Sequence, residues 1–83
     1  SNLVKGFYQN DIIRDQYLDD ELLVLEVGPN FYNLSAYDKR RVLSIVDKEY
    51  GVTTRLNYGV FYLRDWRHSN DIGLYTRYGL QLH

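Results

Sequence analysis

The segment 34–50 constrains the fold most, because it predicts one helix with defined ends and a single apolar side. Ser35 is a suitable N-cap, and Asp38 follows three residues later, where a carboxylate favours a helix start. Apolar residues recur at helical spacing along one side, namely Val42, Ile45, Val46 and Tyr50. Gly51 supplies the left-handed residue that commonly follows a helix. Such a helix must lie against another element, and strand-like segments flank it.

Residues 22–27, which read LLVLEV, predict a strand before this helix. The run is short and apolar, and an acidic turn and a Gly-Pro pair bound it. Its purely apolar face should lie against the helix and consists of Leu23, Leu25 and Val27. Pro29 cannot continue a central ladder, so the chain should turn there.

Alternating side chains after the helix predict further strands at 52–55, 59–66 and 72–77. The first two form either separate strands or one bent strand with a break at 57–59. A polar turn at 67–70 joins the last two as an antiparallel hairpin. Residues 79–82 predict a last edge strand or an extension of the hairpin past a bulge.

The order of elements is therefore (α)-β-α-β-β, which predicts an α+β fold. We expect a small antiparallel or mixed sheet of three to four strands, with the main helix packed on one face. Residues 1–21 are interpreted as an N-terminal arm with a short helix at 10–18, and residues 22–83 as a single small domain. The other sheet face is left to solvent, to the arm or to a partner.

The composition excludes several classes of protein. There is no cysteine, so neither a disulfide framework nor a thiolate metal site is present. The formal net charge of -1 argues against non-specific nucleic-acid binding. No apolar run is long enough to span a membrane. Because the sequence has no methionine and starts with Ser1 and Asn2, as after tag cleavage, we expect a natural parent that is longer at its N-terminus.

A search for chemistry finds no catalytic or cofactor motif. Asp65, His68 and Asp71 surround one predicted turn, where a solvated polar turn is favoured over a weak metal site. The serines are explained by caps and turns, and no nucleophile-elbow pattern surrounds them. The acidic run 19–21 is interpreted as solvated. The sequence therefore predicts no catalytic residues, no cofactor and no metal, and a protein that is not an enzyme.

The strings YNLSAYDKRRVLSIVDKEY and FYLRDWRHSNDIGLYTRYGLQL resemble small uncharacterised domains near the C-termini of some bacterial envelope and lipoprotein-like proteins. Those domains have an aromatic-x-Leu-Ser/Asp helix start, then a hairpin of the type Val-x-Asp-x-Arg-x-Gly-x-x-Ile-Gly-x-Tyr and a closing Gly-Leu. The resemblance covers residues 23–82, and its matching positions are Leu63–Arg67 and Ile72–Tyr75. It implies a bacterial cell envelope or periplasmic location and no activity.

Nine tyrosines and an arginine-rich C-terminal half suggest a contact surface. The tyrosines are explained either by half-burial around a small core or by binding of a partner. The candidate interaction surface consists of Tyr62, Arg64, Trp66, Tyr75, Arg77 and Tyr78. We interpret the chain as a non-enzymatic protein-interaction or structural module of a larger bacterial protein, with a protein partner or a homodimer. The alternative is a nucleic-acid-binding module with an Arg/Tyr-rich sheet face.

Overall fold

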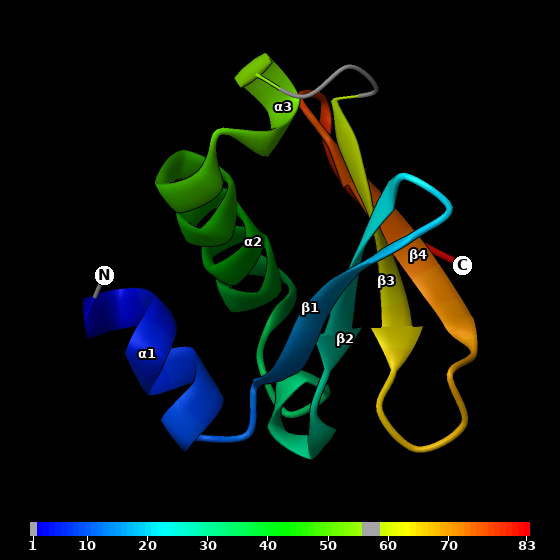
Figure 1. Cartoon of the computed structure of the whole chain (residues 1–83). Helices are drawn as coiled ribbons and strands as arrows, with labels where there is room; N and C mark the ends of the chain where they lie inside the picture. Colours follow the sequence, from blue (N-terminus) through cyan, green and yellow to red (C-terminus); the bar gives the residue numbers. More distant parts are fainter. Residues whose placement is uncertain (1, 56–58) are drawn as a thin grey trace.

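A computed structural model describes residues 2–55 and 59–83 and shows an α+β fold around a mixed sheet. Its five strands have the order β1-β2-β3-β4-β5. Figure 1 shows α1 and α2 on one side of this sheet. The elements in chain order are α1 (Asn2–Gln9), β1 (Ile13–Asp19), β2 (Leu22–Val27), the 3-10 turn η1 (Pro29–Phe31), α2 (Ala36–Tyr50), α3 (Val52–Arg55), β3 (Val60–Asp65), β4 (Asp71–Thr76) and β5 (Gly79–Leu82).

The sheet combines hairpins with one parallel pair. β2 and β3 are parallel, and the other neighbours are antiparallel. A parallel pair requires a crossover connection, and α2 supplies it. Leu25 is opposite Leu63, and both side chains are buried on the helix side. The mixed sheet and the main helix on one face confirm the coarse prediction, but the sheet has five strands instead of three to four.

The ends of α2 confirm the capping prediction. The Ser35 hydroxyl oxygen accepts a hydrogen bond from the Asp38 backbone N–H at 3.0 Å. Gly51 has φ 66° and ψ 37°, the left-handed conformation that a residue with a Cβ rarely adopts. Val42 and Val46 are buried, but Tyr50 is 47% exposed and was wrongly assigned to the apolar side. The core position at this end of α2 is taken by Val52 of α3.

The helix predicted at 10–18 is wrong, because α1 ends at Gln9 and residues 13–19 form β1. Asp11 has φ 56°, which ends the helical path, and the chain then turns into a strand that pairs with β2. The hairpin turn is Asp20-Glu21, with φ 50° and 71°. The turn predicted for the acidic run is confirmed, but such hairpin turns normally contain Asn or Gly, so the sequence did not indicate a hairpin here. Cross-strand pairing outweighed the local pattern.

The strand predicted at 52–55 is also wrong, since these residues form α3. Both the backbone N–H and the hydroxyl of Thr53 donate to the Asp47 carboxylate, at 2.8 and 2.7 Å. This capping holds the chain in a helical turn although its Val and Thr residues favour strands. The break predicted at 57–59 lies mostly outside the described residues.

The hydrophobic core lies between the helices and the sheet. It includes Val4 of α1 and Ile13 of β1, so the residues interpreted as an N-terminal arm share one core with the rest of the chain. Phe31 in η1 closes one end of this core and is fully buried. Among the helices in residues 2–55 and 59–83, none has the length and apolarity needed to cross a membrane.

Candidate functional site

The sheet face that points away from the helices carries its own apolar row. The register places Tyr17, Val24, Tyr62 and Leu74 side by side across β1 to β4. Val24 is fully buried although it is not part of the core between helices and sheet. Half-buried tyrosines flank it on both sides. These rings therefore shield the open face, which fits the interpretation of tyrosine as a half-buried core residue.

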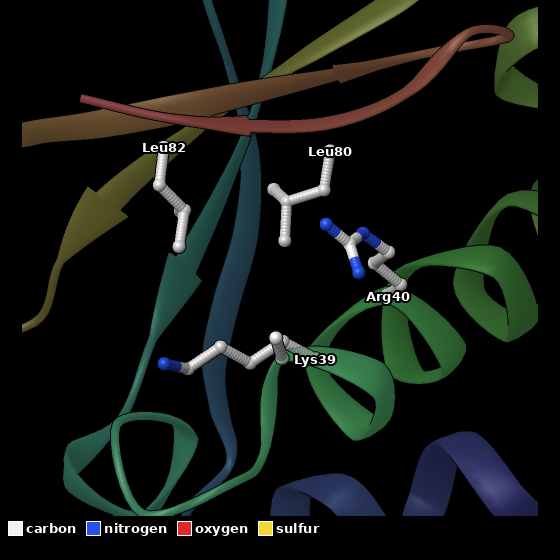
Figure 2. A pocket seen from close by; sticks show the side chains of 5 residues that line it. Lys39, Arg40, Leu80 and Leu82 are labelled. Carbon is white, nitrogen blue, oxygen red and sulfur yellow. The ribbon is translucent and has the colours of Figure 1, made fainter.

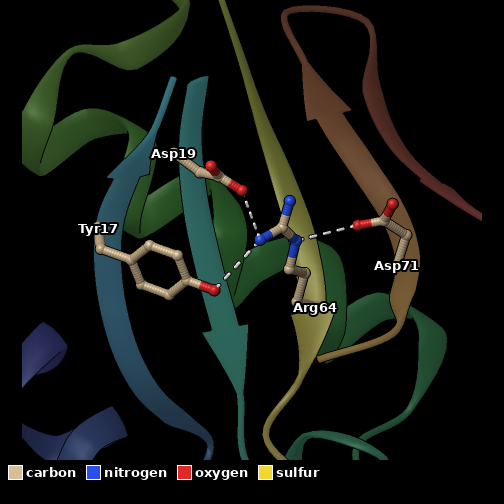
Figure 3. A network of polar contacts seen from close by, with 4 residues as sticks. All are labelled: Tyr17, Asp19, Arg64 and Asp71. Carbon is tan, nitrogen blue, oxygen red and sulfur yellow. Dashed lines mark hydrogen bonds and ion pairs between the residues drawn. The ribbon is translucent and has the colours of Figure 1, made fainter. Parts of the chain in front are cut away.

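Arg64 lies across this open face and joins three strands (Figure 3). Its Nη1 is 2.9 Å from Oδ2 of Asp19 on β1, and its Nε donates to Oδ1 of Asp71 on β4 at 3.2 Å. Nη1 also approaches the Tyr17 hydroxyl at 3.5 Å. Hydrogen bonds to Tyr17, Asp19 and Asp71 raise the pKa of the Arg64 guanidinium. The arginine is therefore a clamp between strands and not a free cation.

The charges of the open face suit a nucleic acid poorly. Arg64 is next to Glu26 in the register, and Glu26 is next to Asp15. With Asp19 and Asp71, this face carries several carboxylates around one arginine that is already paired. A phosphate backbone needs unpaired cations, which the described part of this face does not provide.

An aromatic cluster closes the carboxyl end of the parallel pair. The Tyr32 hydroxyl donates to Oδ2 of Asp65 at 2.6 Å, and the Tyr32 and Trp66 ring centroids are 6.2 Å apart. Partial burial and the neighbouring Asp65 raise the pKa of Tyr32 to about 12. The Tyr32 hydroxyl and the backbone N–H groups of Arg67 and His68 lower the pKa of Asp65. The Arg67 guanidinium lies over the Trp66 ring, with its Cζ atom 4.9 Å from the ring centroid.

This cluster accounts for the residues that were weighed as a metal site. Asp65 accepts the Arg67 backbone N–H at 2.6 Å and so holds the turn. Asp71 pairs with Arg64 instead of turning toward His68. Within residues 2–55 and 59–83, no group of three or more His, Cys, Asp or Glu side chains converges to hold a metal ion.

The structure separates the six residues of the predicted interaction surface. Tyr62 and Arg64 share the open face. Trp66 belongs to the cluster beyond β3. Tyr75 lies on the helix side, stacked on Phe61 at 5.2 Å, and burial raises its pKa. The remaining two, Arg77 and Tyr78, form the β4–β5 turn and contact each other. The six therefore form no continuous patch.

The strand β5 is the edge strand predicted at 79–82, and it presents unpaired backbone groups on its outer side. It pairs with β4, and no strand flanks its other side in the described chain. The His83 N–H donates to the Ile72 carbonyl at 2.9 Å. In an antiparallel ladder, residues that hydrogen-bond to the neighbouring strand alternate with residues that do not. Since His83 hydrogen-bonds to β4, Gln81 and Gly79 also hydrogen-bond to β4. The N–H and C=O groups of Leu80 and Leu82 therefore point away from the sheet.

A hollow of about 150 Å³ lies beside this edge, between β5 and the first turns of α2. Its lining residues are Ala36, Lys39, Arg40, Leu80 and Leu82. In Figure 2 both leucines point from β5 toward α2, and the Arg40 guanidinium points toward Leu80. No carboxylate is among these lining residues. The edge is therefore bordered by an aliphatic floor with two cations at its rim. Their charged groups point apart in Figure 2, and the Lys39 ammonium lies over the Phe31 ring, 5.8 Å from its centroid.

A second hollow of about 230 Å³ lies between α1 and α2. Apolar side chains line it, with Asp38 and Arg41 at its rim. Leu3 is 60% exposed there. These charges of opposite sign select no particular ligand.

Comparisons of this chain with family models, with curated proteins and with solved structures found no match. What the chain binds therefore has to be argued from its own residues. The sequence analysis did not include Lys39 and Arg40 in the candidate surface, because only the observed strand order brings β5 next to the start of α2.

Proposed function

We propose that this chain is a non-enzymatic module that binds an extended segment of a partner protein along the outer edge of β5. The observation that carries the proposal is the outward backbone of Leu80 and Leu82, since an unpaired strand edge is a template for another strand. The chain has no Pro after Pro29, and Gly79–Leu82 contains no charged residue, so β5 lacks the usual protection of an edge.

The size of β5 sets the affinity to expect. Two outward residues offer two N–H and two C=O groups, and each hydrogen bond contributes on the order of 1 kcal/mol net. Micromolar binding requires roughly 8 kcal/mol, so the backbone alone is insufficient. Side chains of the added segment must also contact the hollow beside β5, where Leu80 and Leu82 already form a floor.

The experiment is a selection of displayed random peptides of about seven residues, followed by amide exchange measurements on the complex. We expect binders to protect the Leu80 and Leu82 amides. Leu82→Pro should abolish binding, because proline removes an outward N–H and leaves the ladder to β4 intact. Leu82→Ala is the matched control: it shortens the same side chain, which forms part of the floor, but keeps the N–H, so it should weaken binding without abolishing it. Binders that protect amides elsewhere in the chain but leave the Leu80 and Leu82 amides unprotected would contradict the proposal.

The alternative of nucleic-acid binding gains no support from the open face, because its arginine is paired and its surroundings are acidic. A titration of single-stranded oligonucleotides at several salt concentrations tests it. We expect no measurable binding at physiological ionic strength, whereas salt-dependent binding that Arg64→Gln weakens would favour the alternative.

A parent protein in the bacterial cell envelope is part of the proposal, and the sequence resemblance of residues 23–82 supports it. Fractionation of cells that express the parent gene tests this location. Recovery of the parent with cytoplasmic proteins alone would contradict it.

A further inference from the structure

We propose that the segment bound at β5 is acidic: an Asp or Glu side chain contacts the Arg40 guanidinium, with Lys39 adding positive charge to the same hollow, and an apolar side chain two residues away covers Leu80 and Leu82. This inference rests on the proposed strand addition and names the chemistry of the partner.

The alternation of strand residues determines where the side chains of the added segment must lie. Leu80 and Leu82 point to the helix side, toward α2 (Figure 2). An added strand places every second side chain on that same side, with neighbours roughly 7 Å apart. The hollow between β5 and α2 therefore receives two successive side chains of this kind. One of them covers the leucines, and the next reaches the cations at the rim.

The charge of the hollow selects the second side chain. No ion pair joins Lys39 or Arg40 to a carboxylate in the described chain. Asp38, the nearest acid in sequence, lines the other hollow, between α1 and α2. A guanidinium binds a carboxylate through two parallel hydrogen bonds, so an acidic partner residue supplies what the hollow lacks.

A second copy of the chain does not supply this acid. Its β5 reads Gly-Leu-Gln-Leu, and antiparallel pairing of two β5 strands would place the cations of both copies on the same side. Its β1 carries Asp15 and Asp19, but the register and the contact with Arg64 place these on the open face. An acidic segment of a different protein fits the hollow better than either edge of a second copy.

The test compares two acetylated and amidated peptides of about seven residues that differ at one position. One has Glu two positions from Leu, and the other has Gln in place of the Glu. We expect the Glu peptide to bind about tenfold more tightly at low salt, and the difference to shrink as salt is added. The double variant Lys39→Glu/Arg40→Glu should reverse the preference, so that a peptide with Lys at that position binds best.

Arg41→Glu is the matched control, because Arg41 lies on the same helix but stacks on Tyr37 and lines the other hollow. It should leave the preference for Glu unchanged. Circular dichroism shows whether each variant is folded, and Arg40→Gln provides a milder change if the double variant is not.

The outcomes separate the two proposals. Equal binding of the Glu and Gln peptides, with the Leu80 and Leu82 amides protected, overturns the acidic partner and leaves strand addition intact. Failure of both peptides and of all selected peptides to protect these amides overturns strand addition itself. Light scattering detects whether the chain forms a dimer. A dimer that Leu82→Pro disrupts and that the charge reversal leaves unchanged would show that a second copy, and not an acidic segment, occupies the edge of β5.

Discussion

The two edges of the sheet are built in opposite ways. β1 has seven residues, a register shift between Ile13 and Asp15, and acidic side chains along its length. β5 has four residues, no charge and no bulge. Bulges and charges on an edge obstruct pairing with another chain, so β1 is protected where β5 is not. The contrast indicates that an exposed edge is a local property of β5 and not a general weakness of a small sheet.

The two edges are also held differently. β1 is attached by the buried side chain of Ile13 and by the bridge from Asp19 to Arg64. β5 lies so close to β4 that a Cβ on Gly73 would collide with the Gln81 carbonyl oxygen. Both edge strands pair with a neighbour, and in addition these side chains fix β1, whereas a close backbone approach fixes β5. Each edge can therefore be altered separately.

The largest effect should come from Gly73→Val, which fills the space that the backbone of β5 occupies. We expect a loss of roughly 2 kcal/mol or more in the free energy of unfolding, because β5 must move or detach. Thermal denaturation measures it. Gly6→Ala is the control, since nothing lies within 4 Å of its added Cβ and helix propensity favours Ala. A Gly73 variant as stable as the wild type would show that β5 adds nothing to the core.

Arg64→Gln should have the next largest effect, because it releases Asp19 on β1 and Asp71 on β4 together. We expect a melting temperature a few degrees lower at low salt, and a smaller loss at high salt. Arg14→Gln, which removes only a pair with Asp11 on the exposed surface, should change little. If both variants melt alike, the network does not hold β1.

The Tyr32–Asp65 contact belongs to neither edge, so its loss at alkaline pH should change the stability of the chain without changing either edge. The folded pKa of Tyr32 is raised from 10.0 to about 12, so the unfolded chain loses this proton first as pH rises. The contribution to stability is complete below pH 10 and declines between pH 10 and 12. Tyr32→Phe should flatten this decline in denaturant titrations and leave peptide binding at β5 unchanged. A steep decline that persists in the variant would assign it to another tyrosine.

The smallest effect on stability should come from a lysine placed on each edge. Leu82 is 48% exposed and Leu18 is 69% exposed, so either substitution should change stability by about 0.5 kcal/mol or less. Leu82→Lys should nevertheless weaken peptide binding, because a charge protects an edge strand, whereas Leu18→Lys should not. Equal effects of both variants on binding would remove the contrast between the edges.

The sequence predicted best what is decided locally. The caps at Ser35 and Gly51 and the apolar run 22–27 depend on neighbouring residues, and the structure confirms them. β1 and α3 were missed, because one depends on pairing with β2 and the other on the Asp47 carboxylate.

The candidate site was harder to predict than these elements. The alternation of side chains along β4 was predicted. However, only the pairing of Tyr75 with Phe61 shows that Tyr75 lies on the sheet face that the helices cover. The hollow beside β5 depends on the strand order, which no local pattern contains.

The single parallel pair has a consequence for how the chain folds. The hairpins β1–β2 and β3–β4–β5 join segments close in sequence, whereas β2 meets β3 only after the whole segment 28–59 has been enclosed. Closing this loop is an entropic barrier that the local hairpins do not have. Substitutions at Leu25 and Leu63, where the two halves meet, should therefore slow refolding in stopped-flow experiments. The step that sets the folding rate is then the enclosure of α2 between the two halves of the sheet, and not the formation of either edge.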